Sequence, residues 1–155
     1  METRLQEGIF ELSLRMGMLG TARDNGALTA GLSDREKTVL LLLNQRGKMT
    51  VSQIASAAPD VHYSTISATI TRLWRDEGLV SKKINPESQR ETIVELTEKG
   101  RQVARELLNE RRARFRALVR AIAVTDEEKE ILLRVVNRAI AFFDKHLSVA
   151  RGRRS

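Results

Sequence analysis

Apolar residues along most of this chain recur every three or four positions, which is the spacing of one face of a helix. The pattern predicts helices over residues 4–19, 33–46, 50–58, 63–77, 97–123 and 125–147. Residues 79–96 depart from it. There, two runs rich in β-branched residues, LVSKKI and ETIVEL, flank a polar turn that contains a proline, which is typical of a β-hairpin. We therefore expect a mainly helical chain with one hairpin.

Residues that cap helices mark the ends of these elements. Ser33 with Glu36, and Thr50 with Gln53, have the three-residue spacing of a capping box. Further start and stop signals stand at Thr97, Thr125, Glu128, Gly47 and Gly78. Since these signals fall where the apolar periodicity begins or ends, they support the predicted helices.

Charge narrows the class of partner. The formal net charge is +7 and the pI is about 10.4, which favours a polyanion, nucleic acid before an anionic membrane. The chain has no cysteine, and its two histidines are far apart in sequence, so disulfides, thiol chemistry and zinc–thiolate sites are excluded. No apolar run approaches the roughly 18 residues of a membrane span, and the N-terminus lacks a secretory layout. We expect a cytoplasmic protein without cofactor, metal or membrane partner.

The helix at 63–77 has an unusual surface. At about 100° per residue, Ile66, Ile70 and Leu73 share one face, which is expected to be buried. The other side is small and hydroxylic, and it consists of Ser64, Thr65, Ala68, Thr69 and Arg72. Small polar side chains let a helix axis approach another surface closely, and their hydroxyls bond phosphates or base edges. A poorly optimised surface helix has the same composition, so the helix alone does not decide between the two.

The neighbouring elements favour DNA. A short helix, a turn and this helix make a helix-turn-helix, and a hairpin directly after a recognition helix is a wing that reaches phosphates or the minor groove. The arms of the hairpin carry Lys82 and Lys83, and its tip carries Gln89 and Arg90. A further phosphate is expected before the short helix, at Lys48 and the amide end that begins with Thr50.

Residues 32–100 resemble the winged helix-turn-helix core of the MarR family of bacterial transcription regulators. The most specific pieces are STIS, TRLWRDEGLV, the wing NPESQRETIVELT and LTEKG. The resemblance implies a homodimer in which the first and last two helices of both chains entwine, while two winged lobes meet adjacent major grooves of a pseudo-palindromic operator. Many members are repressors that release DNA when a small-molecule effector, often phenolic or anionic, binds between the dimer helices and the lobe.

Individual residues follow from this resemblance. Ser64, Thr65 and Ser67 match the family's STVS at the start of the recognition helix, Arg72 matches a frequent arginine, and Arg90 matches the most regular wing arginine. We expect bases to be faced by Thr65, Ala68 and Thr69, and the DNA backbone to be held by Ser64, Ser67 and Arg72.

Three departures from the family pattern matter. The usual wing is close to DPEDRR, whereas NPESQR stands here, so Gln89 replaces an arginine and lowers the charge of the wing. Ala68 stands where an arginine is frequent after STVS. The turn before the recognition helix is one residue longer, with Pro59 and Asp60 where one glycine is common, which puts the tilt of that helix in doubt.

The flanking helices predict dimerisation on physical grounds. Two long amphipathic helices beside a small lobe have little core of their own to cover, and a partner chain would supply it. A hairpin folded back within one chain is the alternative. The expected dimer contacts are Leu5, Ile9, Leu12, Ile131, Leu132, Val135, Val136, Ile140, Phe143 and Leu147.

Other features have a structural and a functional interpretation. The arginines of the run RRARFRALVR either bind anions or, as we favour, form a solvated face that pairs with Glu106 and Glu110. Trp74 is expected to pack under the wing or on the long helix rather than to stack on a ligand. His62 caps the recognition helix or touches a phosphate, and His146 complements a helix C-terminus.

These inferences define the expected protein. Its domains are a dimerisation helix and loop at 1–31, a winged lobe at 32–100, completing dimerisation helices at 101–148 and a disordered basic tail at 149–155. No nucleophile, phosphate loop, dinucleotide fingerprint or metal-ligand spacing supports an enzyme. We expect a dimeric DNA-binding regulator, a repressor released by an effector. The alternative is a winged helix that binds protein without specific DNA binding.

Overall fold

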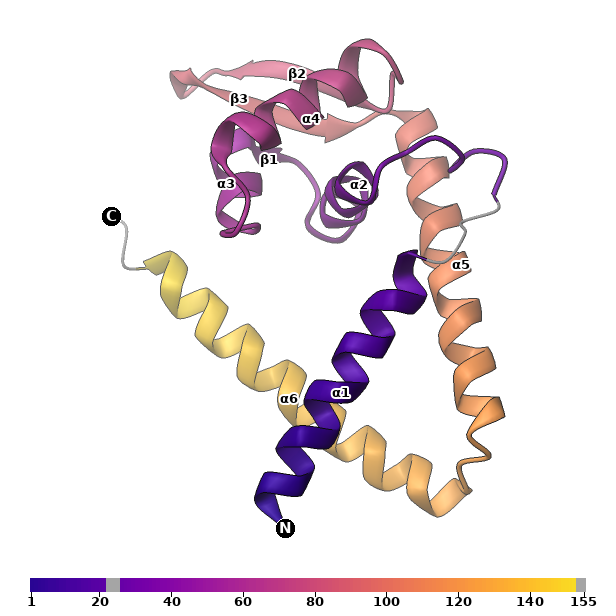
Figure 1. The fold of residues 1–155 in the computed structure, drawn as a ribbon. Helices are drawn as coiled ribbons and strands as arrows, with labels where there is room; N and C mark the ends of the chain where they lie inside the picture. The colour runs from indigo at the N-terminus through magenta and orange to yellow at the C-terminus, as the bar shows by residue number, and fades with distance from the viewer. Residues whose placement is uncertain (22–25, 153–155) are drawn as a thin grey trace. The chain divides into compact units, whose positions relative to one another are not determined.

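The computed structural model describes residues 1–21 and 26–152, apart from the side chains of residues 17, 19–21 and 147–152. Two compact units divide the chain, residues 1–113 and 114–155, and each is described by itself. The elements, shown in Figure 1, are α1 (Glu2–Thr21), α2 (Asp34–Arg46), β1 (Met49–Thr50), α3 (Val51–Ser56), α4 (Tyr63–Arg75), β2 (Val80–Asn85), β3 (Ser88–Leu96), α5 (Glu98–Ala121) and α6 (Asp126–Gly152). The fold is mainly helical with one small sheet, as predicted.

The helix starts follow the predicted caps. At α2, Ser33 Oγ accepts from the Glu36 N–H at 3.3 Å, and Glu36 Oε2 accepts from the Ser33 N–H at 2.7 Å. The same reciprocal pair joins Thr50 and Gln53 at α3. At the end of α2, Gly47 has φ +76°, a left-handed conformation that glycine adopts without a Cβ penalty. These contacts confirm the predicted capping boxes.

The core lies within residues 32–107. The buried face of α4 is Ile66, Ile70 and Leu73, each at most 1% exposed, as its periodicity predicts. This face packs with residues of α2, α3, the sheet and the first half of α5, namely Leu40, Leu43, Ile54, Leu79, Val80, Val94, Val103 and Leu107. The three-residue anchor therefore fixes which side of α4 points outward.

The hairpin belongs to a three-stranded antiparallel sheet with the order β1-β3-β2. Met49 pairs with Val94 and Thr50 with Ile93, so the segment before α3 forms one edge. The sequence did not predict β1, because a two-residue strand has no alternation to detect. β2 and β3 pair from Val80↔Leu96 outward, with an irregularity between Ile84 and Asn85 that ends in a two-residue turn. The predicted wing is confirmed.

The start of α5 packs closely against the connection between α4 and β2. Thr97 caps α5 through Gly100, whose N–H donates to Thr97 Oγ1 at 3.0 Å. A Cβ added at Gly100 would lie 1.9 Å from the carbonyl oxygen of Leu79. Because this contact is to backbone, only glycine fits there. The close approach holds the wing base against α5.

Some boundaries differ from prediction. α4 ends at Arg75 with Asp76 as its C-cap, two residues before the predicted end. α6 continues to Gly152 rather than ending near residue 147, because Ser148, Val149 and Ala150 contain no helix breaker. The tail expected to be disordered from 149 is thus helical to Gly152, and residues 153–155 lie outside the described residues. Within the part described, no helix has the length and apolarity that crossing a membrane requires.

Candidate nucleic-acid interface

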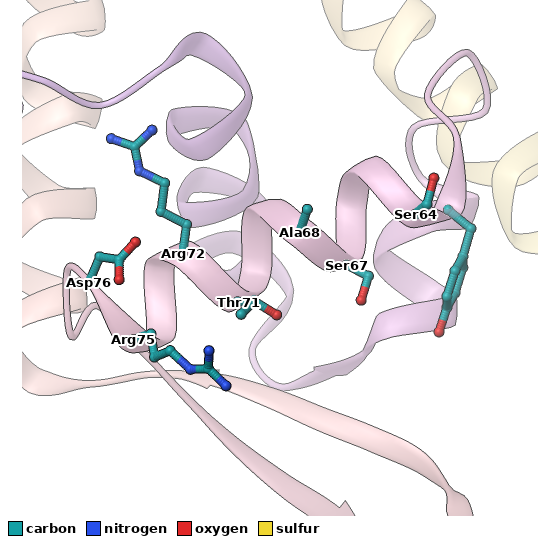
Figure 2. A pocket seen from close by; sticks show the side chains of 8 residues that line it. Ser64, Ser67, Ala68, Thr71, Arg72, Arg75 and Asp76 are labelled. Carbon is teal, nitrogen blue, oxygen red and sulfur yellow. The ribbon is translucent and has the colours of Figure 1, made fainter.

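The outward face of α4 forms a shallow depression, which Figure 2 shows from close by. Its lining runs along one side of the helix at spacings of three and four residues: Tyr63, Ser64, Ser67, Ala68, Thr71, Arg72, Arg75 and Asp76. Small residues dominate the first half and charged residues the second. A partner can therefore approach the axis of α4 closely near Ser64 and Ala68 and meets cations toward its C-terminus.

The predicted base-facing residues do not all lie on this face. Ala68 is exposed in the middle of it, whereas Thr65 and Thr69 are half-buried on its flank. The hydroxyl of Thr69 donates to the Thr65 carbonyl at 2.8 Å, a bond within the helix. At about 100° per residue, Thr69 lies closer to the buried face than Thr71 or Arg75 does. If each residue's helical angle had been measured from the buried face of Ile66, Ile70 and Leu73, the sequence would have placed Thr71 and Arg75 on the outward face of α4.

Arg72 is tied to the interior of the lobe. Its Nε lies 3.1 Å from Oε1 of Glu36, whose side chain is 3% exposed, and its terminal nitrogen lies 3.9 Å from Glu77. The other carboxylate oxygen of Glu36 accepts from the Ser33 N–H. In Figure 2 the Arg72 side chain leaves the helix away from Thr71 and Arg75. Arg72, which was predicted to contact the DNA backbone, thus has a guanidinium that is already paired with Glu36 inside the lobe.

Arg75 has different surroundings. Its guanidinium carbon lies 5.6 Å from the ring centroid of Trp74, and Lys82 Nζ of β2 lies 5.2 Å from the same centroid. Lys82 also donates to Thr71 Oγ1 at 3.5 Å, the long end of the hydrogen-bond range. The indole is 42% exposed, so Trp74 packs beside the base of the wing and not under it. The cations of Arg75 on α4 and Lys82 on the wing therefore lie near the same indole ring, that of Trp74.

The tip of the wing is ordered by Asn85. Its Oδ1 accepts from the Glu87 N–H at 3.1 Å, and its Nδ2 donates to Glu91 Oε2 at 3.0 Å. Gln89 and Arg90 are exposed, and within the described residues neither side chain makes a hydrogen bond or ion pair. Lys83 and Ile84 are exposed on the adjacent strand; Ile84 is 71% exposed. The wing therefore presents donors held on a fixed turn.

The predicted phosphate site before α3 is reduced to one side chain. Thr50 Oγ1 and the Thr50 N–H are both engaged by Gln53. Lys48 is exposed, and its ammonium makes no ion pair among the described residues. Of the two expected phosphate contacts, the Lys48 ammonium is therefore accessible to a phosphate. The hydroxyl and the N–H of Thr50 are instead bonded to Gln53 in the capping box.

The expected dimer contacts are uncovered within each unit. Side chains of α1 in the first unit and of α6 in the second are between 41% and 63% exposed, although all are large and apolar: Leu5, Ile9, Leu12, Ile131, Leu132, Val135, Val136, Ile140 and Phe143. The side chain of Leu147 lies outside the described residues. A solvated apolar stripe of this extent is a mark of an interaction surface.

The remaining candidates have local roles. His62 is the N-cap of α4 by position, but its side chain makes no capping bond. The ring of His146 stacks near Phe142, with centroids 4.0 Å apart, and its Nδ1 lies 2.9 Å from the Phe142 carbonyl oxygen. The α5 arginines are exposed or half-exposed. Among the described residues, no group of three or more His, Asp or Glu side chains converges as a metal site.

Two carboxylates at the start of α6 have shifted pKa values. The Lys129 ammonium, which donates to Asp126 Oδ1 at 2.7 Å, lowers the pKa of Asp126. Hydrogen bonds from the Thr125 N–H and hydroxyl lower the pKa of Glu128. Both carboxylates serve the helix N-terminus, which also favours their charged form. They belong to the capping of α6 and not to the interface on α4.

Comparison with known proteins relates the winged lobe to one family. Residues 32–92 match the model of the MarR family. Over these residues the winged lobe is similar to the MarR family. No curated protein matches the sequence of this chain.

Several solved structures share the fold along nearly the whole chain. A MarR family protein from Bacillus stearothermophilus has a TM-score of 0.73 and 18% identity, covering 92% of this chain and 94% of its own. Streptococcus pneumoniae FabT, solved in complex with DNA, has a TM-score of 0.69 and 17% identity over 94% and 99%. Bordetella bronchiseptica BpsR, whose DNA binding is regulated by 6-hydroxynicotinic acid, has a TM-score of 0.63 and 15% identity over 87% and 98%. The MarR fold therefore extends beyond the lobe to the flanking helices.

Proposed function

We propose that this chain acts as a homodimeric repressor that binds a pseudo-palindromic operator and releases it when a small-molecule effector binds. The observation that carries the proposal is the outward face of α4, where Ser64, Ser67 and Ala68 leave the helix axis accessible beside a basic wing. A major groove accepts a helix with such a face, and the wing then lies over the adjacent backbone. Lys82, Lys83 and Arg90 supply the phosphate contacts of that arrangement.

Dimerisation is supported by the uncovered apolar stripes of α1 and α6. A monomer would keep these large side chains in water, at a cost of about 25 cal/mol for each Å² of apolar surface that a partner would cover. A twofold-symmetric dimer presents two identical lobes, so the net charge of +7 per chain is doubled. Two recognition helices related by a twofold axis match the two halves of a palindrome.

Relatives of the same fold support the DNA and effector parts of the proposal. FabT was solved in complex with DNA, and the DNA binding of BpsR is regulated by 6-hydroxynicotinic acid. By analogy we propose that a small molecule, for which aromatic carboxylic acids are the first class to screen, weakens operator binding of this chain. The same role implies a cytoplasmic protein without catalytic activity.

The test is fluorescence anisotropy with the DNA immediately upstream of the chain's own gene and with a scrambled duplex, at several salt concentrations. Tight binding to the upstream duplex alone is expected, with log K falling by about 0.9 per log salt for each phosphate neutralised. Addition of aromatic carboxylic acids then screens for release. Equal, weak binding to both duplexes would overturn sequence-specific recognition.

A protein-binding winged helix is the second candidate. It is favoured by the tip of the wing, where Ser88 and Gln89 are uncharged. A protein partner would give a shallower salt dependence than a phosphate lattice, because fewer counterions are released. The salt slope of the same experiment therefore separates the two candidates.

A further inference from the structure

The two arginines of α4 have different surroundings, since one is paired within the lobe and the other is exposed. Arg72 is engaged by the buried Glu36 carboxylate, and in Figure 2 its side chain points away from that of Arg75. Arg75 is exposed, and within the described residues its guanidinium makes no ion pair. Its guanidinium lies over the Trp74 ring. Arg75 is thus the recognition-helix cation that is free to take an anion.

We propose that Arg75 of α4 and Lys82 of β2, both held by the Trp74 ring, form a single phosphate-binding site where the recognition helix meets the wing. The inference rests on the proposed function and deepens it, because it adds Arg75, which neither the sequence nor the family resemblance marked, to Lys82 at one backbone phosphate. Trp74 is the positioning residue of the site. Arg75 and Lys82 are the residues that contact the phosphate.

The geometry supports a shared anion. Both cations lie within 6 Å of one ring centroid, so their separation cannot exceed the sum of those two distances. Each is attracted to the negative face of the indole, whereas they repel each other. A phosphate between Arg75 and Lys82 attracts both cations, and its negative charge offsets the repulsion between them. The site is therefore set for an anion before one arrives.

Neighbouring groups agree with this assignment. Thr71 Oγ1 holds Lys82 beside the helix and lies on the same depression as Arg75. Asp76 also lines the depression, but its carboxylate makes no ion pair with Arg75. Trp74 is half-exposed and outside the hydrophobic core, so its aromatic surface is placed for the cations and not for packing the lobe. Stacking on Trp74 also limits the rotamers of Arg75 and Lys82, which reduces the entropy lost on binding.

The experiment measures anisotropy of the upstream and the scrambled duplex with Arg75→Gln and Trp74→Leu chains. Arg112→Gln, an exposed arginine of α5, is the matched control for the loss of one charge. Arg75→Gln is expected to weaken binding to both duplexes by similar factors and to reduce the salt slope by about 0.9 for each lobe that contacts DNA. Arg112→Gln is expected to leave the slope unchanged. An Arg75→Gln slope equal to wild type would overturn the site.

The positioning role of Trp74 is tested by measuring how the effect of its substitution depends on Arg75 and Lys82. Trp74→Leu is expected to weaken binding about two- to fivefold, the effect of a lost exposed cation–π contact. In a chain that also carries Arg75→Gln and Lys82→Gln, the same substitution is expected to change affinity much less, because the groups that it positions are gone. An undiminished effect there, together with a lowered melting temperature, would make Trp74 structural and overturn its positioning role.

A second readout keeps the inference separable from the proposed function. Trp74 is the chain's one tryptophan, so its emission reports on this site alone. Emission is expected to change when either duplex binds. Anisotropy that shows binding with unchanged emission would overturn the site and leave the proposed function standing. A wild-type chain that binds neither duplex with a steep salt slope would instead defeat the proposed function.

Discussion

Arg72 and Glu36 form an ion pair between α4 and α2, with Nε 3.1 Å from Oε1, and the carboxylate is almost completely buried. The same carboxylate closes the capping box of α2 through the Ser33 N–H. One side chain therefore fixes both the start of α2 and the rotation of the recognition helix. In the bound state, a small rotation of α4 would move every residue along its outward face.

Arg72→Ala should destabilise the lobe, because it leaves the Glu36 carboxylate buried without its cation. We expect a loss of about 1–3 kcal/mol in the free energy of unfolding, measured by urea denaturation, since the arginine itself is half-exposed. Arg75→Ala, which removes the neighbouring exposed arginine, should change stability little. Equal unfolding midpoints for Arg72→Ala and wild type would show that the pair contributes nothing.

Gly100→Ala should destabilise the lobe through backbone overlap. The new Cβ would lie 1.9 Å from the Leu79 carbonyl oxygen, so α5 or the base of β2 must shift. Overpacking of this kind costs about 1–3 kcal/mol, to be measured by thermal unfolding. Gly8→Ala is the matched control in α1, where nothing lies within 4 Å of the added Cβ, and it should favour the helix.

Arg90→Ala should weaken binding to the proposed operator without unfolding the chain. The side chain is exposed at the tip of the wing and has no intramolecular partner within the described residues, so its removal costs the fold little. Affinity at fixed salt is the measurement, with circular dichroism as the check on folding. Unchanged affinity would mean that the wing does not reach the DNA through Arg90.

Phe143→Glu should dissociate the proposed dimer, because it places a carboxylate on the apolar stripe of α6. Ala141→Glu adds the same charge on the opposite side of that helix at about 100° per residue, and it should leave the dimer intact. Sedimentation equilibrium gives the mass of each chain. Equal dissociation by both variants, or by neither, would argue against a dimer built on this stripe.

Acid should loosen the start of α6. The pKa of Glu128 is lowered by its bonds to Thr125, so the unfolded helix end binds protons more readily than the folded one. The capping box then stabilises above the ordinary Glu pKa, and its contribution is lost as the pH falls through the lower folded value. Helicity measured by circular dichroism across this range should decline more in wild type than in Thr125→Ala. Identical pH profiles for the two chains would contradict the link.

Local features were predictable because their partners are three or four residues apart. The capping boxes at Ser33, Thr50 and Thr125 depend on the geometry of a single helical turn, so their spacing alone identifies them. The buried face of α4 follows from the same periodicity, as does the wing from alternating strands around a proline turn. The order of the elements followed from the same patterns, whereas the family resemblance added the expected homodimer, operator and effector.

The sequence by itself determined the order of the helices and the wing, where α2, α3, α5 and α6 begin, which face of the recognition helix is buried, and that the chain is basic. Only the tertiary structure decided the roles of Arg72 and Arg75, three residues apart on one helix. Glu36 is remote from Arg72 along the chain, and Lys82 reaches the side of Arg75 across the turn that joins α4 to β2, so both come close only through the path of the folded backbone. The same holds for Met49 beside Val94 and Gly100 beside Leu79. Such contacts depend on how several elements pack together, and the spacing of residues in the sequence does not specify this packing.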